Sequence, residues 1–154
     1  LDYSQMGPRI LYGLCGTKPT PEDCYRVPGY ERDRNGIKKV FNAMTFADKQ
    51  ITRFPKGVKQ MLKEDIRFQE VSDAIQRYHS GIAHKFYVGI GHYLQYLESQ
   101  ILIKVLLGLK ELGIHALPIH DAVVVGKAWV DMSRELMEQV FLDMTNVESW
   151  VQVE

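Results

Sequence analysis

Apolar side chains recur at helical spacing over most of the chain. From residue 31 to residue 46, Ile37, Phe41 and Met44 share one side of a helix. A longer apolar stripe begins near residue 93, and Gly113 stands where a C-terminal cap is expected. The pattern predicts helices over six segments, which are 8–12, 31–46, 56–66, 68–79, 93–112 and 128–144.

Short β-rich runs lie at the two ends of the chain and before the last helix. The four predicted strands are 1–4, 114–119, 122–125 and 149–153. The middle two are separated only by His120 and Asp121, which predicts a hairpin with these residues at its tip. Residues 16–29 contain three prolines and are predicted to form a loop. Without any βα alternation, the pattern favours an α+β fold with a small antiparallel sheet and helices on one face.

Composition changes this picture little. The 154 residues suffice for one compact core, and 45% apolar and 25% charged residues are ordinary for a globular protein. Residues 101–112 are apolar but too short and too charged to span a bilayer. Cys15 and Cys24 lack metal-binding spacing, so plain thiols and a cytoplasmic location are expected. Because the chain begins with Leu1 rather than Met, we interpret it as trimmed or excised.

The formal charge of zero hides an asymmetry along the chain. Residues 31–63 carry nine Lys and Arg against three acidic residues, whereas residues 121–154 carry seven acidic residues against two basic ones. A basic segment can attract nucleic-acid phosphates, but two solvated faces of opposite charge would give the same pattern.

Two aspartates gain a possible chemistry from the predicted sheet. If the strand at residues 1–4 lies beside the hairpin, Asp2 and Asp121 meet at neighbouring strand ends. Such carboxylates suit Mg²⁺, which takes one or two of them together with phosphate oxygens and water. Arg34 and Lys38, four positions apart on a predicted helix, could then hold a triphosphate. Each residue alone is more often a solvated turn, cap or surface residue.

The order of three motifs is more specific than any of these residues. The first motif, DYSQxxxRIL, begins at Asp2. The second, RxxxK, runs from Arg34 to Lys38 and is followed eight positions later by the aromatic Phe46. The third is the pair His120 and Asp121 between two predicted strands. In this order they closely resemble the motifs of family A DNA polymerases and single-subunit phage-type RNA polymerases. The likeness covers nearly the whole chain.

The resemblance implies a nucleotidyltransferase that extends primed nucleic acid from nucleoside triphosphates, with Mg²⁺ or Mn²⁺ as cofactor. Asp2 and Asp121 would be the catalytic metal-binding carboxylates, with the backbone carbonyl of Tyr3 as a further ligand. Arg34 and Lys38 would hold the incoming triphosphate, and Lys38 would also protonate the pyrophosphate leaving group.

Further roles follow from the same resemblance. Asn42 lies on the ladder that begins at Arg34 and, like Phe46 near the nascent base pair, would contribute to nucleotide binding. His120 would lie against the primer end. The remaining predicted nucleic-acid contacts are Arg9, which mainly braces the palm, Lys56 and Lys59.

Two departures from the family pattern concern the choice of sugar. The DNA-polymerising branch typically has Glu at the nucleotide-binding position occupied here by Gly7, as in the RNA-polymerising branch. The latter typically has Tyr where this chain has Phe46. A site without either polar group discriminates poorly over one hydroxyl, so sugar selection is expected to be loose.

The resemblance also divides the chain. Residues 1–30 and 93–154 would form a palm with a palm-type sheet, and residues 31–92 a reduced helical fingers segment. The expected setting is DNA replication in a bacterium, phage or mobile element, without a membrane. Two alternatives stay open, which are a non-catalytic nucleic-acid-binding relic and a fragment of a larger polymerase that needs an upstream thumb region or a partner chain.

Overall fold

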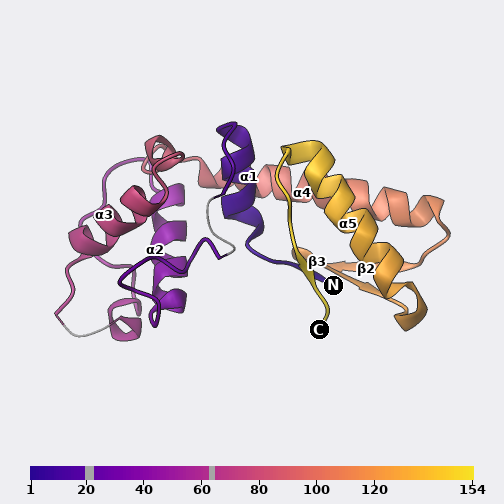
Figure 1. Ribbon diagram of the computed structural model, residues 1–154, viewed down its shortest axis with the longest axis horizontal. Helices are drawn as coiled ribbons and strands as arrows, with labels where there is room; N and C mark the ends of the chain where they lie inside the picture. Colours follow the sequence, from indigo (N-terminus) through magenta and orange to yellow (C-terminus); the bar gives the residue numbers. More distant parts are fainter. Residues whose placement is uncertain (20–22, 63–64) are drawn as a thin grey trace. The chain divides into compact units, whose positions relative to one another are not determined.

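The computed structural model describes residues 1–19, 23–62 and 65–154 (Figure 1). Its fold is α+β, as the apolar pattern predicted. The chain divides into two compact units, which we call the sheet unit (Leu1–Lys18 with Leu94–Glu154) and the helical unit (Pro19–Tyr93). Within the described ranges, no helix combines the length and apolar character needed to cross a bilayer.

The sheet unit contains four short antiparallel strands in the order β2-β3-β1-β4. They are β1 (Asp2–Tyr3), β2 (Ala116–Ile119), β3 (Ala122–Val125) and β4 (Val151–Gln152). All four strands lie in segments predicted to be β. The two chain ends lie side by side at the sheet because β1 pairs with β4 (Figure 1).

One face of the sheet is buried and the other is exposed. Tyr3 and Val123 point to the buried face, where the Tyr3 hydroxyl donates a hydrogen bond to the Met137 carbonyl at 2.6 Å. The opposite face carries Leu117, which is 69% exposed, and its strand partner Val124. The helices of this unit are α1 (Met6–Leu14), α5 (Val130–Thr145) and α4 (Gly91–Glu111), whose first residues belong to the helical unit.

The helical unit is built around α2 (Arg34–Phe46) and α3 (Phe68–Tyr78), which pack against each other. Ile37, Phe41 and Met44 are buried, which confirms the predicted apolar face of α2. Gly36 lies on this face because a Cβ there would stand 2.6 Å from the Leu62 side chain. Glycine has a low helix propensity, but at position 36 it allows the Leu62 side chain to pack closely against α2.

The helix predicted at residues 56–66 is wrong for most of its length. Among its described residues, 56–62 and 65–66, the one helical element is the 3₁₀ turn η1 (Lys59–Met61). Gly57 before the turn has a φ of 80°, and Leu62 after it is extended, so neither neighbour continues a helix. Residues 63 and 64 lie outside the described residues, as do residues 20–22 of the predicted loop.

Candidate functional site

Asp2 lies on β1, and Asp121 lies in the turn that leads into the neighbouring strand β3. Asp2 on β1 stands opposite Ala122 on β3, and Asp121 immediately precedes Ala122. The neighbouring pair, Leu1 and Val123, exchanges two backbone hydrogen bonds. The Leu1 amino group donates to the Val123 carbonyl at 3.1 Å, and the Val123 amide donates to the Leu1 carbonyl at 2.8 Å. Asp2 and Ala122 therefore form a non-hydrogen-bonded pair, in which Cα atoms lie about 4.5 Å apart.

The His-Asp dipeptide forms the tip of the β2–β3 hairpin, as predicted. Ile119 pairs with Ala122, so only two residues turn the chain. His120 takes a φ of 56°, in the left-handed region that such tight turns require. Both His120 and Asp121 are exposed, so each is accessible to a ligand at this edge of the sheet.

Glu98 lies beside this site and was not singled out by the sequence. It stands on α4, and a Cβ built at Gly7 would come within 3.3 Å of its Oε1 atom. Burial, together with the charge of Asp121, raises the pKa of the Glu98 carboxyl above its ordinary value. The absence of a side chain at Gly7 thus leaves space for the Glu98 carboxylate of α4. Sequence spacing could not reveal this, because Gly7 and Glu98 are far apart along the chain.

Asp2 and Asp121 carry the type of oxygen donor that a hard divalent cation prefers. Asp2 and Asp121 offer carboxylate oxygens, and Mg²⁺ usually takes one or two of these and completes its shell with water and phosphate oxygens. Over the described residues, no group of three or more His, Cys, Asp or Glu side chains is placed to hold an ion.

The side chain of Tyr3 is part of the core. Its ring lies 5.5 Å from that of Phe141, and burial raises the pKa of the phenol far above its ordinary value, with a further contribution from Glu138. The phenol is therefore neutral and serves the packing of β1 on α5. Any contact of Tyr3 with a metal would come from its backbone carbonyl.

Arg9 is a buried brace of the sheet unit. It is 1% exposed, its Nη1 donates to the Glu148 carbonyl at 3.0 Å, and its guanidinium lies 3.9 Å from the centre of the Trp150 ring. These contacts tie α1 to the segment that leads into β4. They agree with the bracing role, and they leave the guanidinium inaccessible to a nucleic acid.

The predicted phosphate-binding residues lie together on α2 in the helical unit. Arg34 begins the helix and Lys38 follows one turn later, with both cations over the ring of Tyr25. The Nε atom of Arg34 also forms an ion pair with Asp23 Oδ2 at 2.6 Å. The spacing of Arg34 and Lys38 was visible in the sequence, whereas Asp23 and Tyr25 come from the predicted loop and were missed.

Asn42 and Phe46 continue this side of α2. Asn42 is exposed, and Phe46 is 40% exposed. The Phe46 ring packs edge-to-face on His92 at 5.4 Å, and a Cβ at Gly91 would stand 2.5 Å from it. One side of the ring is thus held by the start of α4, and the remaining surface is available for stacking.

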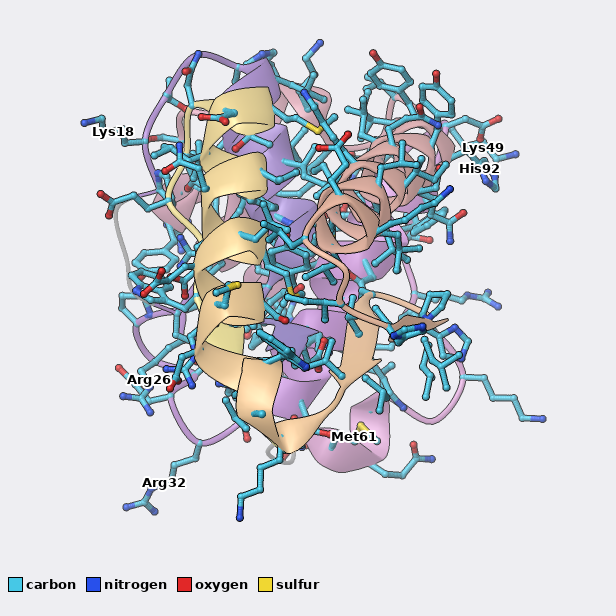
Figure 2. The ribbon with its side chains drawn as sticks, turned by 90° about the vertical axis from the view of Figure 1, so that its right-hand side faces the viewer. Lys18, Arg26, Arg32, Lys49, Met61 and His92 are labelled. Atoms are coloured by element: carbon cyan, nitrogen blue, oxygen red, sulfur yellow. The ribbon has the colours of Figure 1, made fainter. Side chains whose placement is uncertain are left out.

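Much of the basic segment in the helical unit is exposed. Lys56 and Lys59 are exposed on either side of Gly57, close to and within the turn η1. Arg26, Arg32 and Lys49 also project away from the ribbon (Figure 2). Their charges are accessible to phosphates.

Comparison of the chain with models of known protein families, with curated proteins and with solved structures found no match. The arguments for function therefore rest on the motifs and on the geometry of the two units.

Proposed function

We propose that the chain is a template-directed nucleotidyltransferase of the DNA polymerase type. The observation that carries the proposal is the register of β1 on β3, since it places Asp121 next to the strand partner of Asp2. Two acidic residues that are far apart in the sequence thereby come to adjoining positions in the sheet unit. The palm-type character of this sheet and the fingers character of the helical unit are parts of the same proposal.

The residues of the chain would divide the work as follows. Asp2 and Asp121 would hold a divalent cation, which supplies charge neutralisation and activation of the attacking hydroxyl when bound. Arg34 and Lys38 would bind the triphosphate through charge-assisted hydrogen bonds. Phe46 would offer an apolar ring to the base, and His120 would lie near the primer end.

The exposed sheet face supports a nucleic-acid substrate. Leu117, Ile119 and Val124 are exposed on this face, and Asp2 shares it through its pairing with Ala122. These side chains are exposed in the described part of the chain, so an extended substrate could lie across this face next to Asp2. Lys56 and Lys59 on the helical unit would add phosphate contacts.

Primer extension by the full chain tests the proposal. We expect Asp2→Asn and Asp121→Asn each to lower the single-turnover rate on a primed template by about a hundredfold or more, because loss of a metal carboxylate removes several kcal/mol of charge stabilisation. Asp143→Asn removes an exposed charge from α5 and serves as the matched control. Retained extension by either site variant contradicts the assignment.

A metal-binding measurement separates an enzyme from a non-catalytic relic. Mn²⁺ binding, followed by electron paramagnetic resonance with and without a nucleoside triphosphate, should tighten with the nucleotide and be lost in Asp121→Asn. Nucleic-acid binding without nucleotide-dependent Mn²⁺ binding would identify the relic instead.

A further inference from the structure

Asp23 is fixed in place through both of its carboxylate oxygens. Oδ2 accepts the hydrogen bond from Arg34 Nε at 2.6 Å, and Oδ1 accepts one from the Tyr25 amide at 3.0 Å. Partial burial alone would raise the pKa of Asp23. The hydrogen bonds from Arg34 and the Tyr25 amide, with the charges of Arg34 and Arg26, outweigh burial and lower the pKa, so the carboxylate is ionised at neutral pH.

Tyr25 holds the two cations of α2 at a fixed spacing. Its ring is 4% exposed and packs edge-to-face on Phe41 at 5.7 Å. The Arg34 Cζ atom lies 5.4 Å from the centre of this ring, and the Lys38 Nζ atom lies 5.9 Å from it. One buried ring therefore faces two positive groups that are a helical turn apart.

The ion pair with Asp23 engages one hydrogen-bond donor of the Arg34 guanidinium, at Nε, and leaves the terminal nitrogens to other ligands. A guanidinium has five N–H donors in a planar fork, and the ion pair with Asp23 uses the Nε edge. With Nε engaged, the two terminal nitrogens can still make a bidentate contact with phosphate oxygens. A side chain held at Nε also loses less rotamer entropy when it binds an anion.

We infer that Asp23 is a positioning residue that holds Arg34 by its Nε edge, so that the terminal nitrogens of Arg34, together with Lys38, bind the polyphosphate of a nucleoside triphosphate. The identity of the ligand rests on the proposed function. The role of Asp23 is separate from that function, because it concerns polyphosphate binding by the helical unit without catalysis.

The sign of one substitution distinguishes positioning from simple charge. An acidic residue close to an anion site repels the anion, so its removal should tighten binding if charge alone mattered. If Asp23 positions Arg34, removal should weaken binding. Asp23→Asn suits the test because its amide oxygen can still accept the hydrogen bond from Tyr25, while the acceptor for Arg34 Nε is lost.

The experiment is calorimetric titration of the full chain with inorganic tripolyphosphate, with chelator present to exclude divalent metals. We expect Asp23→Asn to weaken binding about fivefold, the loss of roughly one hydrogen bond's net contribution. Glu31→Gln removes a negative charge from the same segment and should leave the affinity unchanged or slightly tighter. Unchanged or tighter binding by Asp23→Asn overturns the inference, as does an absence of binding by the unaltered chain.

A double-mutant cycle shows whether Asp23 acts through Arg34. In the background of Arg34→Gln, Asp23→Asn should have no further weakening effect. An equal effect in both backgrounds would overturn the inference, since it would mean that Asp23 supports the loop in general. If the effect of Asp23→Asn on tripolyphosphate binding depends on Arg34 but the chain does not extend primers, the proposed function alone is contradicted. If the chain extends primers but the effect of Asp23→Asn does not depend on Arg34, the inference alone is contradicted.

Discussion

Asp2 lies opposite Ala122 in antiparallel register, which makes Asp121 the neighbour of its strand partner. Backbone bonds between Leu1 and Val123 set this register. Replacement of Asp2 or Asp121 by Asn should therefore leave the sheet intact. A loss of activity in these variants can thus be assigned to chemistry once the far-UV circular dichroism is shown to be unchanged.

Gly13 is required where α1 meets α5. A Cβ at this position would stand 2.5 Å from the Thr145 backbone oxygen, and a backbone atom cannot swing aside as a flexible side chain can. We expect Gly13→Ala to lower the free energy of unfolding by about 1–3 kcal/mol, despite the higher helix propensity of Ala. Urea denaturation followed by the fluorescence of Trp129 and Trp150, which both belong to this unit, measures the change.

Gly126 provides the control for this prediction. Its φ is −61°, and the nearest atom to a Cβ there is 3.5 Å away on Trp129. Gly126→Ala should shift the free energy of unfolding by less than about 0.5 kcal/mol, as surface substitutions usually do. If both glycine variants destabilise equally, the close approach of α1 and α5 is not the cause.

His79 should make the helical unit sensitive to acid. Its ring is fully buried, which favours the neutral form, and Nε2 donates a hydrogen bond to the Cys24 carbonyl at 2.8 Å. Burial lowers the pKa of His79 below 6.5, although the hydrogen bond to Cys24 opposes this. Below pH 6.5 the unfolded chain therefore binds more protons, and the free energy of unfolding should fall by up to about 1.4 kcal/mol per pH unit.

Hydrogen exchange of the α3 amides at pH 5.5 and 7.5, corrected for intrinsic exchange rates, measures this dependence. His79→Gln should reduce the difference between the two pH values, because its amide can still donate to Cys24 but does not titrate. The exposed residue His84 supplies the control, since His84→Gln should retain the full dependence.

The exposed lysines near η1 should contribute to nucleic-acid binding through charge. Lys56→Gln and Lys59→Gln are each expected to reduce the slope of log K against log salt concentration by about 0.7–0.9, the contribution of one phosphate contact. Fluorescence anisotropy with a labelled oligonucleotide at several salt concentrations gives the slope. Lys110→Gln, an exposed lysine on α4, is the matched control and should leave it unchanged.

The sequence predicted those elements whose stability is local. The apolar face of α2 and the two-residue hairpin turn at His120 and Asp121 follow from spacing and turn chemistry alone. The segment at residues 56–66 has a similar composition, yet Gly57 lies in the left-handed region before the turn η1 and Leu62 is extended after it, so no longer helix forms in the described part of this segment. The spacing of apolar residues does not predict the φ angle of a neighbouring glycine such as Gly57.

The parts of the site that the sequence did not predict depend on long-range contacts. Glu98 reaches Gly7 from α4, and Asp23 reaches Arg34 from a loop of irregular structure. Neither Glu98 nor Asp23 stands at a sequence spacing that relates it to the site, because each lies on a different segment from the residue it approaches. Asp2 and Asp121 were singled out because the predicted sheet brings neighbouring strand ends together and because each belongs to one of the three ordered motifs.

The position of β1 in the interior of the sheet has a consequence for the order in which the protein is made. As the chain leaves the ribosome, the first strand has no partner until residues 122–125 and then 151–152 have been synthesised. Pairing across such long separations in sequence is slow, whereas α2 and α3 are close neighbours along the chain. The nascent polypeptide should thus complete α2 and α3 before β1, which carries Asp2, finds its partners in β3 and β4.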